Sequence, residues 1–147
     1  MDLKQMLIEA NRFSEDIKFV FINEYKKLLD ENELSQKQSL VLSILDKKHR
    51  LTMNEIAEII NGTPSAASQF IQKLEKKQYV KRETNKENRR VVFVYLDEKG
   101  KQFFTDMIAI DERVLEKYFL RLPEEDIIKY HEILKKLHHI VVSGGES

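Results

Sequence analysis

Residues 64–77 predict a helix whose outer face carries hydrogen-bonding and basic side chains. Projected at about 100° per residue, the apolar residues gather on one side, which must be buried. They are Ala67, Phe70, Ile71 and Leu74. The outward set is Ser65, Ser68, Gln69, Gln72, Lys73 and Lys76. Amides can pair with the N6/N7 edge of adenine, hydroxyl groups can serve several bases, and lysines reach phosphates. The face could therefore read DNA, although a polar face is also typical of any solvated helix.

A second polar group lies at the tip of a charged stretch, residues 83–90, between two apolar runs. The tip residues that could contact DNA are Lys86, Asn88, Arg89 and Arg90. An arginine on a projecting loop is attracted by the negative potential of a minor groove. The alternative is that these charges only keep an exposed loop soluble.

The charges of the chain are balanced in total but separated along the sequence. There are 25 basic and 25 acidic residues, so the net charge is zero. Residues 73–90 hold 8 basic and 3 acidic residues, a net +5, and the remainder holds 17 basic and 22 acidic residues, a net −5. A neutral total argues against a nucleic-acid binder, but the separated field favours one. It predicts weak, salt-sensitive non-specific binding to DNA.

Composition excludes several other kinds of site. The chain of 147 residues has no Cys, which rules out disulfides, thiolate zinc sites, iron–sulfur clusters and a cysteine nucleophile. With 41% hydrophobic and 34% charged residues but only 4 Gly and 2 Pro, it is expected to be globular and helix-rich. No apolar run is long enough to span a bilayer, and the N-terminus does not resemble a signal peptide, so we expect a cytoplasmic protein.

Cap signals predict the helices around the candidate DNA face. Ser35 with Gln38, and Thr52 with Glu55, have the spacing of capping boxes. Thr63 and Pro64 are expected to begin the next helix as N-cap and first helical residue. Gly62 is expected to take the left-handed conformation that closes the preceding helix. A helix over 54–60 and a second over 64–77 would form a helix-turn-helix.

The spacing of apolar residues changes after this motif and then returns to the spacing typical of helices. Residues 79–82 and 91–96 are rich in β-branched and aromatic side chains and predict a hairpin, which makes the motif a winged helix-turn-helix. Apolar steps of three and four predict a long helix from Leu3 to a turn at residues 30–32. They predict another from a cap at Asp97 to Leu122 and, after the Pro123 break, a last one through Val141.

The expected fold is mainly α with a small β-hairpin wing. Residues 35–97 would form a winged helix-turn-helix DNA-binding domain, and residues 1–34 and 98–147 a region of long dimerisation helices. The apolar faces of these terminal regions are too long for a small winged-helix core to cover, which predicts association of two copies.

This order of elements resembles the MarR-type winged-helix regulators of bacteria over essentially the whole chain. The most specific stretches are Leu-Glu-Lys-Lys-Gln-Tyr-Val (74–80), Asn-Arg-Arg (88–90) and Val-Tyr-Leu-Asp-Glu-Lys-Gly (94–100). In this family the wing usually has Asp-x-Arg, a Thr opens the next helix, and a Gly follows the recognition helix. Here Asn88, Asp97 and Gln78 stand at those positions, and Arg90 takes the place of the wing arginine.

The resemblance implies a transcriptional regulator that acts as a repressor on double-stranded DNA. It would be a homodimer with interlocked first and last helices, reading a pseudo-palindrome through two recognition helices. It also implies release by a small, often aromatic, effector, since the absence of Cys removes a thiol switch. Apolar candidates for an effector pocket are Phe13, Ile17, Phe103 and Tyr118, which plain core packing explains equally well.

Other chemistries find less support. The histidines are His49, His131, His138 and His139, and two of them share a helical face, but no tight His or Cys pair indicates zinc. Packing and the helix dipole explain the adjacent pair near the C-terminus. No nucleophile elbow, phosphate loop or carboxylate dyad indicates an enzyme, and no cofactor is expected. The alternative function is a winged-helix module that binds a protein partner without specific DNA binding.

Overall fold

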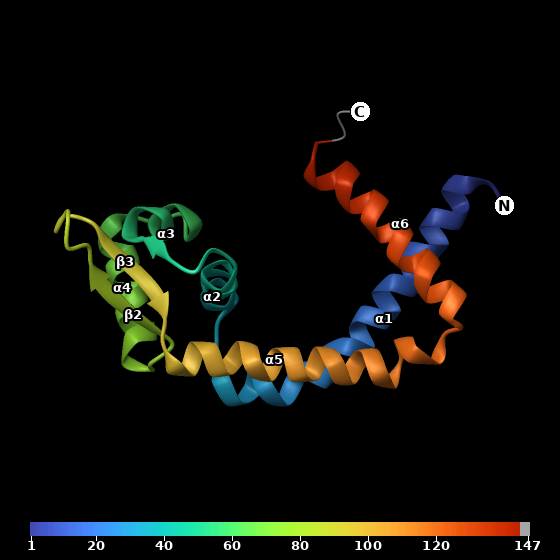
Figure 1. The fold of residues 1–147 in the computed structure, drawn as a ribbon, viewed down its shortest axis with the longest axis horizontal. Helices are drawn as coiled ribbons and strands as arrows, with labels where there is room; N and C mark the ends of the chain where they lie inside the picture. The colour runs from blue at the N-terminus through green and yellow to red at the C-terminus, as the bar shows by residue number, and fades with distance from the viewer. Residues whose placement is uncertain (145–147) are drawn as a thin grey trace. The chain divides into compact units, whose positions relative to one another are not determined.

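The computed structural model describes residues 1–144, which form a mostly helical fold with one small sheet (Figure 1). The chain divides into two compact units, Met1–Ile108 and the residues from Ala109 onward. The order of elements confirms the expected class. The elements are α1 (Leu3–Asn32), α2 (Gln36–Lys48), β1 (Leu51–Thr52), α3 (Met53–Ile59), α4 (Pro64–Lys76), β2 (Val80–Thr84), β3 (Val92–Leu96), α5 (Glu98–Lys117), the 3₁₀ turn η1 (Phe119–Arg121) and α6 (Glu124–Val142). Among the described residues, no helix is both long and apolar enough to cross a membrane.

The predicted capping boxes begin α2 and α3. The Ser35 hydroxyl accepts a hydrogen bond from the backbone of Gln38, whose side chain accepts one from the backbone of Ser35. Thr52 and Glu55 repeat this pair of bonds. The Glu55 carboxylate accepts from the backbone N–H of Thr52, and this hydrogen bond, followed by one with the Thr52 hydroxyl, lowers the pKa of Glu55 below its ordinary value. Each box satisfies two backbone donors that a helix start leaves open.

Two helix ends differ from the predictions. α1 continues through Asn32, past the predicted turn, and Glu33 takes the left-handed conformation (φ 49°). After α3 the left-handed residue is Asn61 (φ 54°) and not Gly62. Asn visits this region more readily than most residues because its short amide can hydrogen-bond locally. The turn of the helix-turn-helix therefore depends on Asn61, while the glycine beside it has ordinary backbone geometry.

The end of α5 also differs from the prediction. The helix stops at Lys117, before the expected Leu122, and η1 leads into Pro123, the N-cap of α6. Glu124, the first residue of α6, begins an acidic first turn, where the helix dipole favours negative charge. The spacing of apolar residues alone does not show where α5 ends, because side chains in a 3₁₀ turn recur at nearly the same interval as in an α-helix.

The sheet has three antiparallel strands in the order β1-β3-β2. The wing strands pair from Val80 with Leu96 to Thr84 with Val92, and β1 adds Leu51 opposite Val94. β1 was not predicted, since two residues are too few to show an alternating pattern. The sheet closes a core with α2, α3 and α4 whose fully buried members include Leu42, Leu45, Ile56, Ile71, Leu74 and Val94.

Tyr79 joins three elements of the N-terminal unit. Its side chain is fully buried, and its hydroxyl donates to Asn32 Oδ1 (2.6 Å) at the end of α1. Its carbonyl accepts from the backbone N–H of Asp97 (2.9 Å), just before α5. Gly100 lies against the same carbonyl, and a Cβ placed there would be 2.3 Å from the oxygen. The ends of α1 and α4 and the start of α5 therefore meet at one residue.

We expect Gly100→Ala to lower the free energy of unfolding by about 3 kcal/mol, because the new methyl group collides with a backbone oxygen that cannot rotate away. Inside a helix the same change would otherwise stabilise the protein by about 0.5–1 kcal/mol. Chemical denaturation measures the difference. Gly62→Ala is the matched control: its Cβ would meet only side-chain atoms at 3.4 Å, and its effect stays within about 0.5 kcal/mol. Equal effects of the two changes would contradict the steric role of Gly100.

Candidate nucleic-acid interface

The outer face of α4 is exposed as the sequence predicts. The exposed members are Ser65, Gln69, Gln72, Lys73 and Lys76. On the opposite side Ala67, Ile71 and Leu74 are fully buried, while Phe70, predicted as core, is half-buried. Thr63 accepts a hydrogen bond from Ala66 N and Pro64 is the first helical residue, so α4 begins where predicted. Hydroxyl and amide groups lie toward its N-terminal half and ammonium groups toward its C-terminal half.

One flank of α4 is tied to the wing by Arg82 on β2. The guanidinium donates to Glu75 Oε1 (2.6 Å), to Ser68 Oγ (3.1 Å) and to the Ser68 carbonyl (3.0 Å). Arg82 and Glu75 are only 29% and 33% exposed, so water screens this pair less than a fully exposed one. Ser68 is half-buried at this flank, and its hydroxyl oxygen accepts from the guanidinium. Arg82 thus fixes the wing against the helix that it flanks.

Arg82 belongs to the predicted basic segment but was not predicted as a site residue. No spacing rule connects it with Glu75 and Ser68, because the contacts run between a helix and a strand. The only signal is that a strand following the helix must lie beside it, which leaves the partner of any one side chain undetermined.

The wing tip is shaped by two asparagine side chains. Asn85 Oδ1 accepts from the backbone N–H of Glu87 (2.9 Å), and Asn88 Oδ1 accepts from the backbone N–H of Arg90 (3.1 Å). The backbone N–H of Asn85 donates to the Val91 carbonyl (2.9 Å), which closes the loop. Such local bonds let Asn form tight turns without an ion pair. Asn88 therefore holds the backbone that carries Arg90.

The cationic side chains of the tip extend into solvent. Lys86, Arg89 and Arg90 are all exposed, as is Asn88. Together with the exposed face of α4, the tip gives a helix with hydrogen-bonding groups and a neighbouring loop with guanidinium groups. The hydrogen-bonding groups of α4 could bind base edges in a major groove. The guanidinium groups of the tip could bind phosphates or a neighbouring minor groove.

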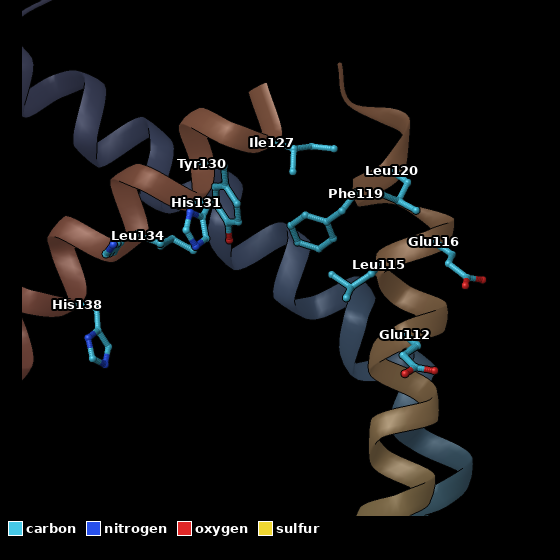
Figure 2. A pocket seen from close by; sticks show the side chains of 11 residues that line it. Glu112, Leu115, Glu116, Phe119, Leu120, Ile127, Tyr130, His131, Leu134 and His138 are labelled. Atoms are coloured by element: carbon cyan, nitrogen blue, oxygen red, sulfur yellow. The ribbon is translucent and has the colours of Figure 1, made fainter. Parts of the chain in front are cut away.

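The C-terminal unit has an apolar groove of about 880 Å³. Figure 2 shows its lining side chains, which come from the last turns of α5, from η1 and from α6. Its apolar members are Leu115, Phe119, Leu120, Ile127, Tyr130 and Leu134. His131 and His138 also line it, but among residues 1–144 no group of three or more His, Asp or Glu side chains could hold a metal ion.

The predicted effector-pocket residues are in different environments. Phe103 is 3% exposed and packs edge-on against Phe104, so it belongs to the core. Phe13 and Ile17 on α1 are 58% and 49% exposed. Tyr118 lies in the C-terminal unit, between α5 and η1. An effector site stays a prediction.

Comparisons with known proteins agree with the mainly helical fold and its winged helix-turn-helix. A sequence model described as the MarR family matches residues 34–92. The HTH-type transcriptional regulator TcaR of Staphylococcus aureus is 31% identical over 116 residues, which cover 78% of this chain and 76% of TcaR. The crystal structure of YusO from Bacillus subtilis has a TM-score of 0.71 at 24% identity, covering 95% of this chain and 99% of YusO. A point mutant of MepR from S. aureus, solved bound to an oligodeoxyribonucleotide, has a TM-score of 0.64 at 19% identity, covering 87% of this chain and 94% of MepR.

We expect Arg82→Met to lower the free energy of unfolding by about 1–2 kcal/mol, because it removes three hydrogen bonds from a partly exposed site. The affinity of Arg82→Met for duplex DNA should be about 10-fold lower than that of Lys81→Met, a difference of about 1.4 kcal/mol, since Arg82, unlike Lys81, bonds the wing to α4. Lys81→Met is the matched control because it removes one positive charge from the neighbouring exposed residue of β2. Thermal unfolding and fluorescence anisotropy measure the two effects, and indistinguishable variants would contradict the role of Arg82.

Proposed function

Because this chain belongs to the MarR family of transcriptional regulators, which are not enzymes, we propose that it is a repressor that binds a pseudo-palindromic operator as a homodimer. That the protein is a DNA-binding regulator follows from its family. The observation that carries the proposal is the exposed face of α4 beside a braced cationic wing. MepR, which shares the fold, has been solved with an oligodeoxyribonucleotide, and this supports the same docking here.

The proposed DNA contacts follow the chemistry of each side chain. Ser65, Gln69 and Gln72 lie near base edges in the major groove, where amides can make paired hydrogen bonds. Ser68 joins them through the hydrogen of its own hydroxyl, whose oxygen accepts from Arg82. Lys73 and Lys76 hold phosphates, and these contacts position the helix without reading sequence. In the wing, Lys86, Arg89 and Arg90 contact the backbone or the minor groove, and Asn88 keeps Arg90 in place.

The proposed dimer rests on helices that the single chain leaves uncovered. Along its whole length, Leu3–Asn32, α1 buries only Leu28, and α6 buries no residue. Most of the stability of a helix in a protein comes from packing its apolar face, so such helices need a partner. Large apolar side chains at least 50% exposed include Leu3, Leu7, Phe13, Phe19 and Ile22 on α1, and Ile128, Ile133, Leu137, Ile140 and Val141 on α6.

A second copy of the chain is the occupant that fits these faces. Two-fold association pairs the same apolar surface with itself, so one amphipathic pattern serves both partners. The groove of the C-terminal unit, with Phe119 and Tyr130 at 5.8 Å between ring centroids, offers a hollow for the apolar ridge of a partner helix. Dimerisation also gives two recognition helices, which a pseudo-palindromic operator requires.

The DNA contacts can be separated by their effect on sequence preference. We expect the protein to retard a fragment of the DNA upstream of its own gene at low salt, and Gln69→Ala to cost about 1–3 kcal/mol on the preferred sequence while relaxing the preference. Lys76→Ala should weaken all sequences alike and reduce the salt slope by about 1. Gel retardation over a salt series and selection from random duplexes measure both.

Two results would contradict the proposal. Binding that is absent at low salt, or insensitive to salt and to Arg90→Ala, would favour a module that docks on protein. Equal effects of Gln69→Ala and Lys76→Ala on all sequences would contradict the separate roles of the amide and the ammonium group.

The dimer is tested by placing a charge on its apolar face. We expect Leu137→Glu to shift the protein toward monomer by about 100-fold or more. Each copy loses the burial of the half of Leu137 that the single chain leaves exposed, and it places an unpaired carboxylate in the apolar interface, and the change occurs twice. Sedimentation equilibrium measures the dissociation constant. Lys136→Glu puts the same side chain one residue away, outside the apolar stripe, and should leave the dimer intact. A wild-type monomer, or a dimer unaffected by Leu137→Glu, would contradict the proposed interface.

A further inference from the structure

The flank of α4 opposite the wing borders a cleft of about 820 Å³ in the N-terminal unit. It is lined by the N-terminal turn of α2 (residues 35–38) and by the turn between α3 and α4 (residues 60–62). The rest of its lining comes from α4 and includes Gln69, Phe70 and Lys73. Two of these, Gln69 and Lys73, also belong to the exposed face that the proposed function places on DNA. The cleft therefore continues the DNA-facing surface beyond the recognition helix.

Helix geometry puts the cleft and the wing on opposite sides of α4. At about 100° per residue, Ser68 and Glu75, which hold Arg82, lie roughly 90° from the centre of the outer face near Gln69 and Lys76. Phe70, which lines the cleft, lies about as far from that centre in the opposite sense. A helix in a major groove lies between two phosphate backbones, one from each strand. A wing on one flank can contact the backbone of only one strand at that groove.

The positive charge of the cleft is complementary to the phosphate backbone of the other DNA strand. Its charged lining residues are Lys37 and Lys73, and none of the described residues that line it is acidic. Lys37 Nζ lies 3.5 Å from the carbonyl of Ile60, which also lines the cleft. An ammonium group has three N–H donors, so this single long contact leaves donors for a phosphate. Lys37 lies outside the basic segment of residues 73–90, and the charge pattern of the sequence did not single it out.

We propose that this cleft is a second DNA phosphate site, in which Lys37 and Lys73 hold the backbone of the strand opposite to the one that the wing contacts. The inference rests on the proposed function, because it concerns the same DNA complex. It adds Lys37 to the interface and makes the grip on each half-site two-sided. Lys37 contributes affinity and register, and it reads no sequence.

The first test compares two lysines of one helix. In the full-length protein, Lys37→Gln should reduce the slope of log K against log[salt] by about 0.9 and weaken all duplexes about 5- to 10-fold near 0.1 M salt, the effect of one lost phosphate contact. Lys47→Gln removes the same charge from the far end of α2 and should leave the slope unchanged. The probes are the DNA upstream of the gene and a random-sequence duplex of the same length.

Three observations separate a phosphate contact from other roles. Lys37→Arg should restore binding, and the unfolding temperature of Lys37→Gln should equal that of the wild type. A lowered unfolding temperature would overturn the proposal, because Lys37 would then act by capping the end of α3 through the Ile60 carbonyl. A slope unchanged by Lys37→Gln would also overturn it. If the wild type binds DNA in that case, the proposed function survives, whereas a wild type that binds no DNA contradicts both.

The second test locates the strand. Replacing single phosphates with neutral methylphosphonates should reveal a position that costs the wild type affinity but costs Lys37→Gln nothing, since the partner lysine is already absent. A second position should behave in this way for Arg90→Ala. We expect the two positions on opposite strands of one half-site. Finding both on the same strand, or no position that depends on Lys37, would overturn the proposal.

Discussion

The buried Tyr79 side chain and its backbone carbonyl set the geometry on which the proposed DNA-facing surface depends. The hydroxyl bonds to Asn32, whose own amide donates to the Leu28 carbonyl (2.7 Å) in the last turn of α1. The carbonyl accepts from Asp97 and leaves no room for a side chain at Gly100. Burial raises the pKa of Tyr79, and the charge of Glu33 raises it further, so the hydroxyl remains a donor well above neutral pH. A long helix, the end of the recognition helix and the start of α5 are thereby held at one point.

This junction explains why the chain accepts strain at the neighbouring residue. Gln78 takes a left-handed conformation (φ 64°), which is costly for a residue with a side chain, and its carbonyl accepts from Lys99 N (3.1 Å). The MarR-type pattern has glycine at this position, and here the surrounding bonds hold the conformation instead. The stacking of Lys99 on the Tyr79 ring, 4.9 Å from its centroid, adds a further contact across the same turn.

Local signals in the sequence were sufficient for the elements, but not for the contacts between them. The boxes at Ser35 and Thr52 and the start at Thr63 were predicted because a cap depends on residues three positions apart. The ion pair between Arg82 and Glu75 and the pairing of Leu51 with Val94 join residues that only the fold brings together. For the site, the sequence predicted which side chains of α4 are outward, because helical period decides that. It did not reveal that Lys37 and Lys73 line one cleft, because β1 and α3 lie between their two helices in the chain.

The neutral net charge of the chain bears on how such a protein stays on DNA. Charges more than about 8 Å apart are largely screened at physiological salt, so the basic segment and the proposed phosphate site in the cleft act over short distances. Without a long-range excess of positive charge, however, one winged helix-turn-helix has only its few phosphate contacts to hold it on DNA. Linking two such domains makes the second binding event intramolecular, and the affinity gained then depends on whether both domains can bind their half-sites at the same time. In the proposed dimer, the apolar faces of α1 and α6 therefore bear on specificity as well as on folding, because an operator with the wrong spacing keeps one set of contacts and loses the other.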